Sequence, residues 1–243
     1  MKLYSWDLSP YSARVRMQIY AKGLTDIAIE PPPTYGTPRF YEDYPIGRIP
    51  LLEIDGEAMP ESGVIAEYLE EVYPEPSLLG ATPRENAHIR TLARIGDIYL
   101  LNNTFLLAVQ TRVLAAPTPV TTGNEGIVAL LGGQLASNTK ALDRMIGQGG
   151  FACLGRVTLA DCALAPALFF LENVLPGAGL ADPIAANPNV AAYWAAIQRE
   201  ASAARILVEL RRGLEERREL IRSGAIEKMR AASRAAREAA EQT

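Results

Sequence analysis

The first thirty residues, MKLYSWDLSPYSARVRMQIYAKGLTDIAIE (1–30), contain the pattern that decides the fold of the N-terminal part of the chain. Lys2–Trp6 is predicted to form a short strand, and Ser12–Lys22 a helix that ends at Gly23. Ile27–Glu30 has the composition of a second strand. Two strands joined by a helix of this length form a βαβ unit, in which the strands run parallel.

A second group of elements follows a loop. Pro31–Tyr44 is predicted to be a loop with at most one irregular helix, because it contains a run of prolines and a glycine. The pattern then predicts a strand at 50–54, a tight hairpin turn at Asp55-Gly56, and a returning strand at Glu57–Met59. Ser62–Val72 has apolar residues three and four apart, as in a helix with one buried face. The order β-α-β-loop-β-β-α predicts one α/β domain over residues 1–76.

The remainder of the chain has long helical patterns and no clear strand signals. Prolines bracket a linker at residues 77–84. Helices are predicted at 85–115, at 125–146, at 159–174, and from Pro188 onward with Asn187 as the cap. We therefore expect a second, all-α domain over 85–212 and a charged tail over 213–243. Within the tail, 227–242 is predicted to be a marginal helix or disordered.

Composition and charge exclude several classes of function. The chain has 243 residues, of which 49% are hydrophobic and 21% charged, as in ordinary globular proteins. A formal net charge of -4 provides no broad attraction for phosphate backbones or anionic lipid, so neither nucleic acid nor a membrane is an expected partner. The N-terminus lacks the apolar core of a secretory signal, and no run of about 18 uncharged apolar residues is present. A cytoplasmic protein is expected.

Cysteine and histidine are scarce in this chain. Cys153 and Cys162 are the only cysteines and lack CxxC spacing, so a disulfide framework is not expected. His88 is the only histidine, which argues against the usual Cys/His zinc sites, and no metal is expected. A Ser-His-Asp hydrolase would need His88, whose charged neighbours predict a solvated helix face instead.

Four short motifs resemble those of one known family. They are Ser9-Pro10-Tyr11-Ser12 with Arg14-Val15-Arg16, Gly47-Arg48-Ile49-Pro50, Glu61-Ser62 with Ile65, Tyr68 and Leu69, and Thr158-Leu159-Ala160-Asp161. Each motif is weak alone, but their order and spacing resemble those of the glutathione transferase family over roughly residues 1–210. The resemblance implies a thioredoxin-like α/β domain followed by an all-α helical bundle. It also implies a homodimer and a role in detoxification.

The resemblance further implies that glutathione binds at the first two motifs. The Ser9 hydroxyl would hold the thiolate, and a cis Ile49–Pro50 bond would turn the backbone of Ile49 toward the cysteinyl unit. Plain alternatives remain for both motifs. Ser9 can be only a turn or cap residue, with Ser12 as a rival hydroxyl, and Pro50 can simply begin a strand.

The remaining contacts implied by the resemblance are ionic. Glu61 would bind the γ-glutamyl ammonium, while Ser62 and the helix amides beside it would bind the γ-glutamyl carboxylate. Arg48 would meet the glycyl carboxylate, for which Arg39 is a weaker candidate. The plain alternatives are that Ser62 only caps its helix and that Arg48 is an ordinary exposed arginine.

The serine indicates how such a site would work. A thiol with a pKa of about 8.5 is mostly protonated at neutral pH, and lowering this pKa by two units requires about 2.7 kcal/mol. A hydrogen bond from the Ser9 hydroxyl and the positive end of the first helix dipole together reach this magnitude. Because serine cannot form a mixed disulfide, the site predicts addition, substitution, isomerisation or peroxide reduction by glutathione itself.

The second substrate is predicted to be a hydrophobic electrophile. The resemblance implies that Tyr11, residues 103–107 and the C-terminal segment line its site, and these positions are mostly apolar. Two other functions compete with this prediction. A non-catalytic ligand-binding or interaction module of the same fold would have no need of the Ser9, Glu61 and Ser62 set, and a thiol oxidoreductase would need a cysteine in place of Ser9.

Overall fold

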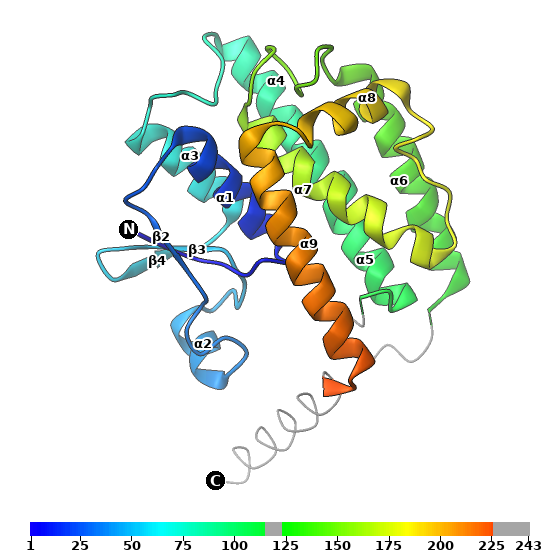
Figure 1. Ribbon diagram of the computed structural model, residues 1–243, viewed down its shortest axis with the longest axis horizontal. Helices are drawn as coiled ribbons and strands as arrows, with labels where there is room; N and C mark the ends of the chain where they lie inside the picture. Colours follow the sequence, from blue (N-terminus) through cyan, green and yellow to red (C-terminus); the bar gives the residue numbers. More distant parts are fainter. Residues whose placement is uncertain (115–122, 226–243) are drawn as a thin grey trace.

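The computed structural model describes residues 1–114 and 123–225 and shows two domains (Figure 1). The N-terminal domain contains a four-stranded sheet with the order β2-β1-β3-β4. β1 is parallel to β2, whereas β3 is antiparallel to both β1 and β4. The strands are β1 (Lys2–Tyr4), β2 (Ala28–Glu30), β3 (Leu51–Ile54) and β4 (Glu57–Met59). The predicted thioredoxin-like domain is thereby confirmed.

Helices cover both faces of this sheet. Successive residues of a strand point to opposite faces, so neighbouring residues pack against different helices. Leu3 and Leu52 pack with residues of α1 and α3 on one face. Their neighbours Tyr4 and Leu51 pack with Phe40 of α2 on the other face. The helices of this domain are α1 (Pro10–Lys22), α2 (Pro38–Asp43) and α3 (Ser62–Val72).

α1 begins at Pro10, not at Ser12 as predicted. Ser9 is the N-cap residue, and its Oγ accepts a hydrogen bond from the backbone N–H of Ser12 at 3.2 Å. Proline suits the first helical position because it lacks an N–H that would have no partner there. The C-terminus is at the predicted place, with Gly23 in the left-handed region at a φ of 67°.

The first helices of the second domain form one run with a local change of geometry. α4 (Pro83–Arg94), η1 (Ile95–Leu101) and α5 (Asn102–Thr111) follow one another without a break, where one regular helix was predicted over 85–115. η1 is a π-helical segment, a rare geometry that is frequent at functional sites. Gly96 packs closely against α7 (Leu159–Val174), since a Cβ on it would lie 3.2 Å from the carbonyl oxygen of Ala163.

The later helices are α6 (Glu125–Met145), α7 (Leu159–Val174), the short 3-10 segment η2 (Pro176–Ala178), α8 (Pro188–Ile197) and α9 (Ala201–Arg222). α6, α7 and α8 begin at their predicted positions, whereas η2 and α9 were not predicted as separate helices. Asn187 is the N-cap residue of α8 as predicted, but its side chain donates to the carbonyl of Pro183 instead of capping the helix. The predicted all-α domain is confirmed.

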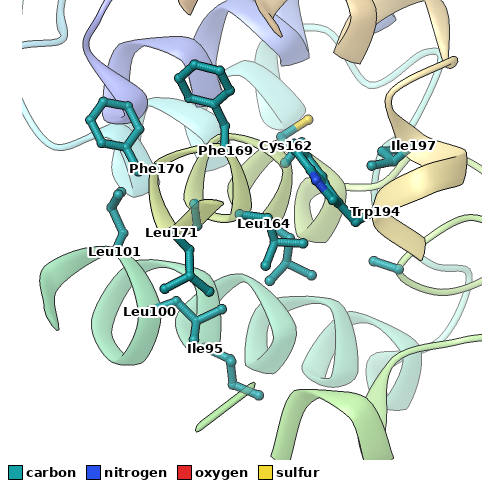
Figure 2. Packing of buried hydrophobic residues seen from close by; sticks show 14 of the residues in the cluster. Ile95, Leu100, Leu101, Cys162, Leu164, Phe169, Phe170, Leu171, Trp194 and Ile197 are labelled. Atoms are coloured by element: carbon teal, nitrogen blue, oxygen red, sulfur yellow. The ribbon is translucent and has the colours of Figure 1, made fainter. Parts of the chain in front are cut away.

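α7 is the central helix of this domain. Every residue from Leu159 to Leu171 is buried. Leu164 and Leu171 point toward the side chains of η1, and Cys162 lies on the side of Trp194 (Figure 2). The stretch Leu159–Ala178 is long and apolar enough to span a membrane by length and composition, but most of it is buried inside the protein. Its apolar character is therefore that of a core helix.

α9 extends past the boundary that the sequence indicated at 212/213. The helix continues to Arg222, and both Gly213 and Leu214 are buried. The first part of the predicted tail is therefore helical and packed against the protein. The weak structure predicted for 227–242 lies outside the described residues.

A buried ionic network joins α1 to α3 and to the segment that links the domains. Lys22 Nζ lies 2.9 Å from Glu70 Oε1 and also donates to the carbonyls of Tyr73 and Pro76. Gln18 donates to Glu70 as well, at 3.0 Å. Buried charges need partners of this kind because an isolated ion in the interior is very costly. The network anchors the interdomain segment to the first domain.

Candidate functional site

A cleft with a volume of about 830 Å³ lies between the two domains. Its walls come from the turn before β3, the N-terminal ends of α1 and α3, and the α4–η1 run. This volume is within the range of small-molecule sites. The cleft lining includes Arg48, Ile49, Pro50, Glu61 and Ser62, all of which the sequence nominated for glutathione. The fold thus brings together residues from two separate motifs.

The Ile49–Pro50 peptide bond is cis, as predicted. Pro50 is buried and immediately precedes β3, while Ile49 is half-buried at the cleft. In the described chain, none of the backbone hydrogen bonds outside the helices and the sheet involves Ile49. The backbone N–H and C=O of Ile49 therefore have no backbone partner among these bonds.

Glu61 and Ser62 stand at the beginning of α3. Glu61 is exposed and has a φ of 71°, a region that residues other than glycine seldom occupy and that is found often at functional sites. Ser62 is the first helical residue and is 6% exposed. The first amides of a helix lack partners within the helix, so the end of α3 offers N–H donors and a positive dipole end to an anion in the cleft.

Ser9 does not line the cleft itself, although Tyr11 and Arg14 of the same helix do. It is half-buried at the N-cap of α1, so the cap interpretation is confirmed. The cap uses a lone pair of Oγ, and the hydroxyl proton makes no hydrogen bond to any described residue. The cap and a donor role are therefore compatible. The rival Ser12 is fully buried, so its hydroxyl is closed to a ligand.

The arginines of the cleft differ in their pairing. Arg14 and Arg90 have acidic partners, whereas Arg48 and Arg94 have none among residues 1–114 and 123–225. Both unpaired arginines are exposed. Arg39, the weaker candidate for the glycyl carboxylate, lies on α2 outside the cleft lining and pairs with Asp43 at 2.8 Å.

Two ion pairs in the cleft were not foreseen from the sequence. Arg14 Nη1 donates to Asp97 Oδ2 at 2.5 Å, which joins α1 to η1 across the domain boundary. Arg90 binds Glu67 through two hydrogen bonds of 2.8 and 2.7 Å, and the pKa of Glu67 is lowered by this contact. Because Arg14 and Asp97 are 83 residues apart in the chain, no local pattern could have paired them.

An apolar wall borders the cleft beside Tyr11. The Tyr11 ring stacks on Phe105 with 6.1 Å between centroids, and Phe105 in turn meets Phe170 of α7. Burial raises the pKa of Tyr11, so its phenol remains protonated. Tyr11 and Phe105 thus lie side by side, while the expectation that residues 103–107 line a second-substrate site stays a prediction.

The remaining candidate groups lie away from the cleft. Cys153 and Cys162 are buried and unpaired with each other, and burial raises the pKa of both thiols. His88 is half-buried on α4 and is not part of the cleft lining. In the described part of the chain, no group of three His, Cys, Asp or Glu side chains could hold a metal ion.

Comparison with known families identifies both domains. Residues 3–77 match the family profile described as glutathione S-transferase, N-terminal domain, and residues 126–196 match the one described as glutathione S-transferase, C-terminal domain. A maleylacetoacetate isomerase of Pseudomonas aeruginosa is 32% identical over 71% of this chain and 82% of its own length. The maleylacetoacetate isomerase of Rattus norvegicus is 32% identical over 68% and 74%, respectively.

Solved structures show the same architecture. A glutathione S-transferase of Methylobacterium radiotolerans in complex with glutathione sulfonate superposes with a TM-score of 0.70 at 21% identity. The match covers 84% of this chain and 92% of that structure. The structure of a glutathione S-transferase III in apo form has a TM-score of 0.69 at 28% identity and covers 85% and 95%, respectively.

Proposed function

Because the chain belongs to the glutathione S-transferase family, we propose that it binds glutathione in the cleft and that the Ser9 hydroxyl stabilises the glutathione thiolate. The observation that carries this proposal is the convergence of the cis Ile49–Pro50 turn and the start of α3 on one cleft. An extended tripeptide held at these two points can reach the first turn of α1.

The charges of the cleft suit the ends of this tripeptide. Glu61, which has no cationic partner among the described residues, accepts the γ-glutamyl ammonium. Ser62 and the first amides of α3 bind the adjacent carboxylate, since helix N-termini favour anions. Arg48 meets the glycyl carboxylate, and an arginine can make two parallel hydrogen bonds to such a group.

Ser9 then acts on sulfur. Its hydroxyl proton has no acceptor among the described residues, so it is available to a thiolate near the start of α1. This donation, with the positive end of the helix dipole, favours the ionised thiol and lowers its pKa. The thiolate attacks an electrophile, which lies against the apolar wall of Tyr11 and Phe105.

Substitution of Ser9 tests this role. Ser9→Ala is expected to keep glutathione affinity within several-fold but to raise the pKa of the bound thiol and to lower kcat strongly. The thiol is titrated by thiolate absorbance near 240 nm, and turnover is measured with chlorodinitrobenzene. Ser9→Thr keeps a hydroxyl and is expected to retain part of the wild-type kcat and part of the lowering of the thiol pKa. An unchanged thiol pKa in Ser9→Ala would remove Ser9 from the mechanism.

The same measurements separate an enzyme from a binding module. A non-catalytic module would be retained on glutathione-agarose but would show no chlorodinitrobenzene turnover above the uncatalysed rate. An enzyme shows both retention and turnover.

A second candidate is an isomerase that acts on an anionic unsaturated acid. The maleylacetoacetate isomerases among the relatives favour it, as does Arg94, whose charge faces the cleft without a partner among the described residues. Arg94→Gln is expected to raise KM for an anionic acceptor such as maleylacetoacetate about tenfold, because a charge-assisted hydrogen bond is lost. It should leave KM for neutral chlorodinitrobenzene unchanged. Arg39→Gln, an exposed arginine outside the cleft lining, is the control.

We also propose that the protein is a homodimer. Exposed apolar side chains at the cleft, Val64 on α3 and Ile98 on η1, continue to exposed Tyr99 outside the cleft lining, and a second copy can cover this surface. Light scattering is expected to give twice the 26.3 kDa chain mass at micromolar concentration. A monomer at this concentration would contradict the proposal.

A further inference from the structure

The turn that ends at Ser9 is held in place by the helical domain. The chain between β1 and α1 forms a tight turn in which the N–H of Ser9 donates to the carbonyl of Trp6 at 3.0 Å. α9 runs beside α1 in Figure 1, and its residues Glu209, Arg212 and Gly213 reach this region. Residues three and four apart share one face of a helix, so a single face of α9 is directed at the turn.

Arg16 is the centre of these contacts and is only 2% exposed. Its Nη1 donates to the carbonyl of Trp6 at 2.8 Å and to the Ser5 hydroxyl, and its Nη2 donates to the carbonyl of Asp7 at 2.9 Å. Its Nε donates to Glu209 Oε2 at 2.7 Å. The rigid fork of the guanidinium therefore joins three consecutive residues of the turn to one carboxylate of α9.

Glu209 is itself fixed by neighbours. Its Oε1 accepts a hydrogen bond from the Tyr20 hydroxyl at 2.8 Å and lies 3.7 Å from Arg205. The Arg205 guanidinium stacks over the Tyr20 ring at 3.7 Å from its centroid. Burial and the hydrogen bond to Glu209 raise the pKa of Tyr20 to about 12, so the phenol stays a donor at neutral pH.

The other two residues of this face of α9 contact the turn directly. Arg212 lies 2.5 Å from a carboxylate oxygen of Asp7 at the surface. Gly213 has no room for a side chain, because a Cβ on it would lie 2.7 Å from the backbone nitrogen of Leu8. The helix and the turn are therefore in backbone contact just before Ser9.

We infer that Arg16 and Glu209 are positioning residues, which form a latch by which α9 holds the Ser9 turn in place for the glutathione thiol. The inference rests on the proposed role of Ser9. Neither Arg16 nor Glu209 is among the residues that line the cleft, so the latch acts through the turn and not by contact with the ligand. It affects the chemical step more than glutathione binding, since the ends of glutathione bind at the cis-proline turn and α3.

The variant Glu209→Gln tests the latch while it preserves the other hydrogen bonds of Arg16. It is expected to raise the pKa of bound glutathione, to lower kcat about tenfold and to leave KM for glutathione within about twofold, because small misplacements of reacting groups cost rate. Glu215→Gln is the control, since Glu215 lies on the same helix with an exposed side chain. The control should resemble the wild type in all three quantities.

Gly213→Ala provides a second variant with no change of charge. The added methyl group presses on Leu8 and displaces the turn, so kcat is expected to fall and the thiol pKa to rise as in Glu209→Gln. If both variants lower only the melting temperature and leave the thiol pKa and kcat unchanged, the contacts are purely structural and the inference is overturned.

Combination with Ser9→Ala separates this inference from the proposed function. If the latch acts through Ser9, the single variant Glu209→Gln differs from the wild type in thiol pKa, but the double variant has the same thiol pKa as Ser9→Ala alone. If Ser9→Ala alone leaves the thiol pKa unchanged, the proposed role of Ser9 fails, and the latch is then tested by the mobility of the turn.

Acrylamide quenching of the fluorescence of exposed Trp6, assigned with Trp6→Phe, reports this mobility and should increase in Glu209→Gln. Unchanged quenching overturns the latch.

Discussion

α1 and α7 are both buried along most of their length, but for different chemical reasons. α7 is buried because its side chains are almost all apolar. α1 is buried although it carries polar and charged side chains. Its buried polar and charged side chains are Ser12, Arg14, Arg16, Gln18 and Lys22. The comparison shows that burial of a helix can be encoded by its own composition or by partners elsewhere in the chain.

The buried charge of α7 is Asp161, and it stands where a helix accommodates a carboxylate best. Asp161 Oδ2 accepts from the Thr158 N–H at 2.9 Å, and Oδ1 accepts from the Ala152 N–H at 2.7 Å. A carboxylate in the first turn also faces the positive end of the helix dipole. This charge therefore follows a local rule that can be recognised in the sequence.

The charges of α1 follow no such local rule. Arg14 pairs with Asp97 of η1, Arg16 with Glu209 of α9, and Lys22 with Glu70 of α3. Each partner lies on a different element. α1 therefore connects α3 of its own domain with η1 and α9 of the helical domain.

The largest effect is expected from breaking one pair of α1. Lys22→Met leaves Glu70 as an uncompensated buried carboxylate, because the Lys22 side chain is 0% exposed and Glu70 only 4%. The free energy of unfolding is expected to fall by about 3–5 kcal/mol. Urea denaturation measures the loss, with Lys140→Met on the exposed side of α6 as control. An unchanged midpoint would show that the pair carries no structural role.

A somewhat smaller loss is expected from an apolar truncation in α7. Leu168→Ala removes a side chain that is 0% exposed and leaves a cavity. The expected cost is about 3 kcal/mol, within the range of buried Leu-to-Ala substitutions. The same denaturation assay applies, and Leu130→Ala, at a site that is 59% exposed, should change little. Equal losses at both leucines would contradict the central place of α7.

A double variant sharpens the comparison by removing both charges of the α1 pair. In Lys22→Met with Glu70→Gln, the glutamine can still accept a hydrogen bond from Gln18 or from the Leu78 N–H. Neither position of this pair then carries a buried charge. About half of the stability lost in Lys22→Met should return, because an isolated buried charge costs more than the lost pair. A double variant as unstable as the single one would mean that lost packing, not charge, is responsible.

The smallest effect is expected from the exposed charge of α7. Glu172 accepts a hydrogen bond from Trp194 Nε1 at 3.0 Å, and glutamine can accept the same bond. Glu172→Gln should therefore change the free energy of unfolding by less than about 0.5 kcal/mol. A loss comparable to that of Lys22→Met would show that solvent exposure does not decide how much a charged residue of either helix contributes to stability.

Residues near one another in sequence were placed well by sequence reasoning. The hairpin at Asp55-Gly56 has φ values of 52° and 87°, as its turn type requires, and α7 begins at the predicted capping motif. Family resemblance added the cis Ile49–Pro50 bond. The start of α1 was misplaced because either Ser9 or Ser12 could cap a helix, and only the folded chain shows which one does.

By itself the sequence determined the two-domain order, the sheet and most helix positions, because turn chemistry, capping and hydrophobic periodicity act over a few residues. It also nominated Arg48, Ile49, Pro50, Glu61 and Ser62, which line part of the cleft. The tertiary structure alone decided that Arg14 and Asp97 pair across the domains and that Gly213, assigned to a tail, touches the turn before Ser9. Such contacts join positions far apart in the chain. The sequence around a charged residue or a glycine does not indicate which distant residue it contacts, because only packing of the whole chain brings the two together.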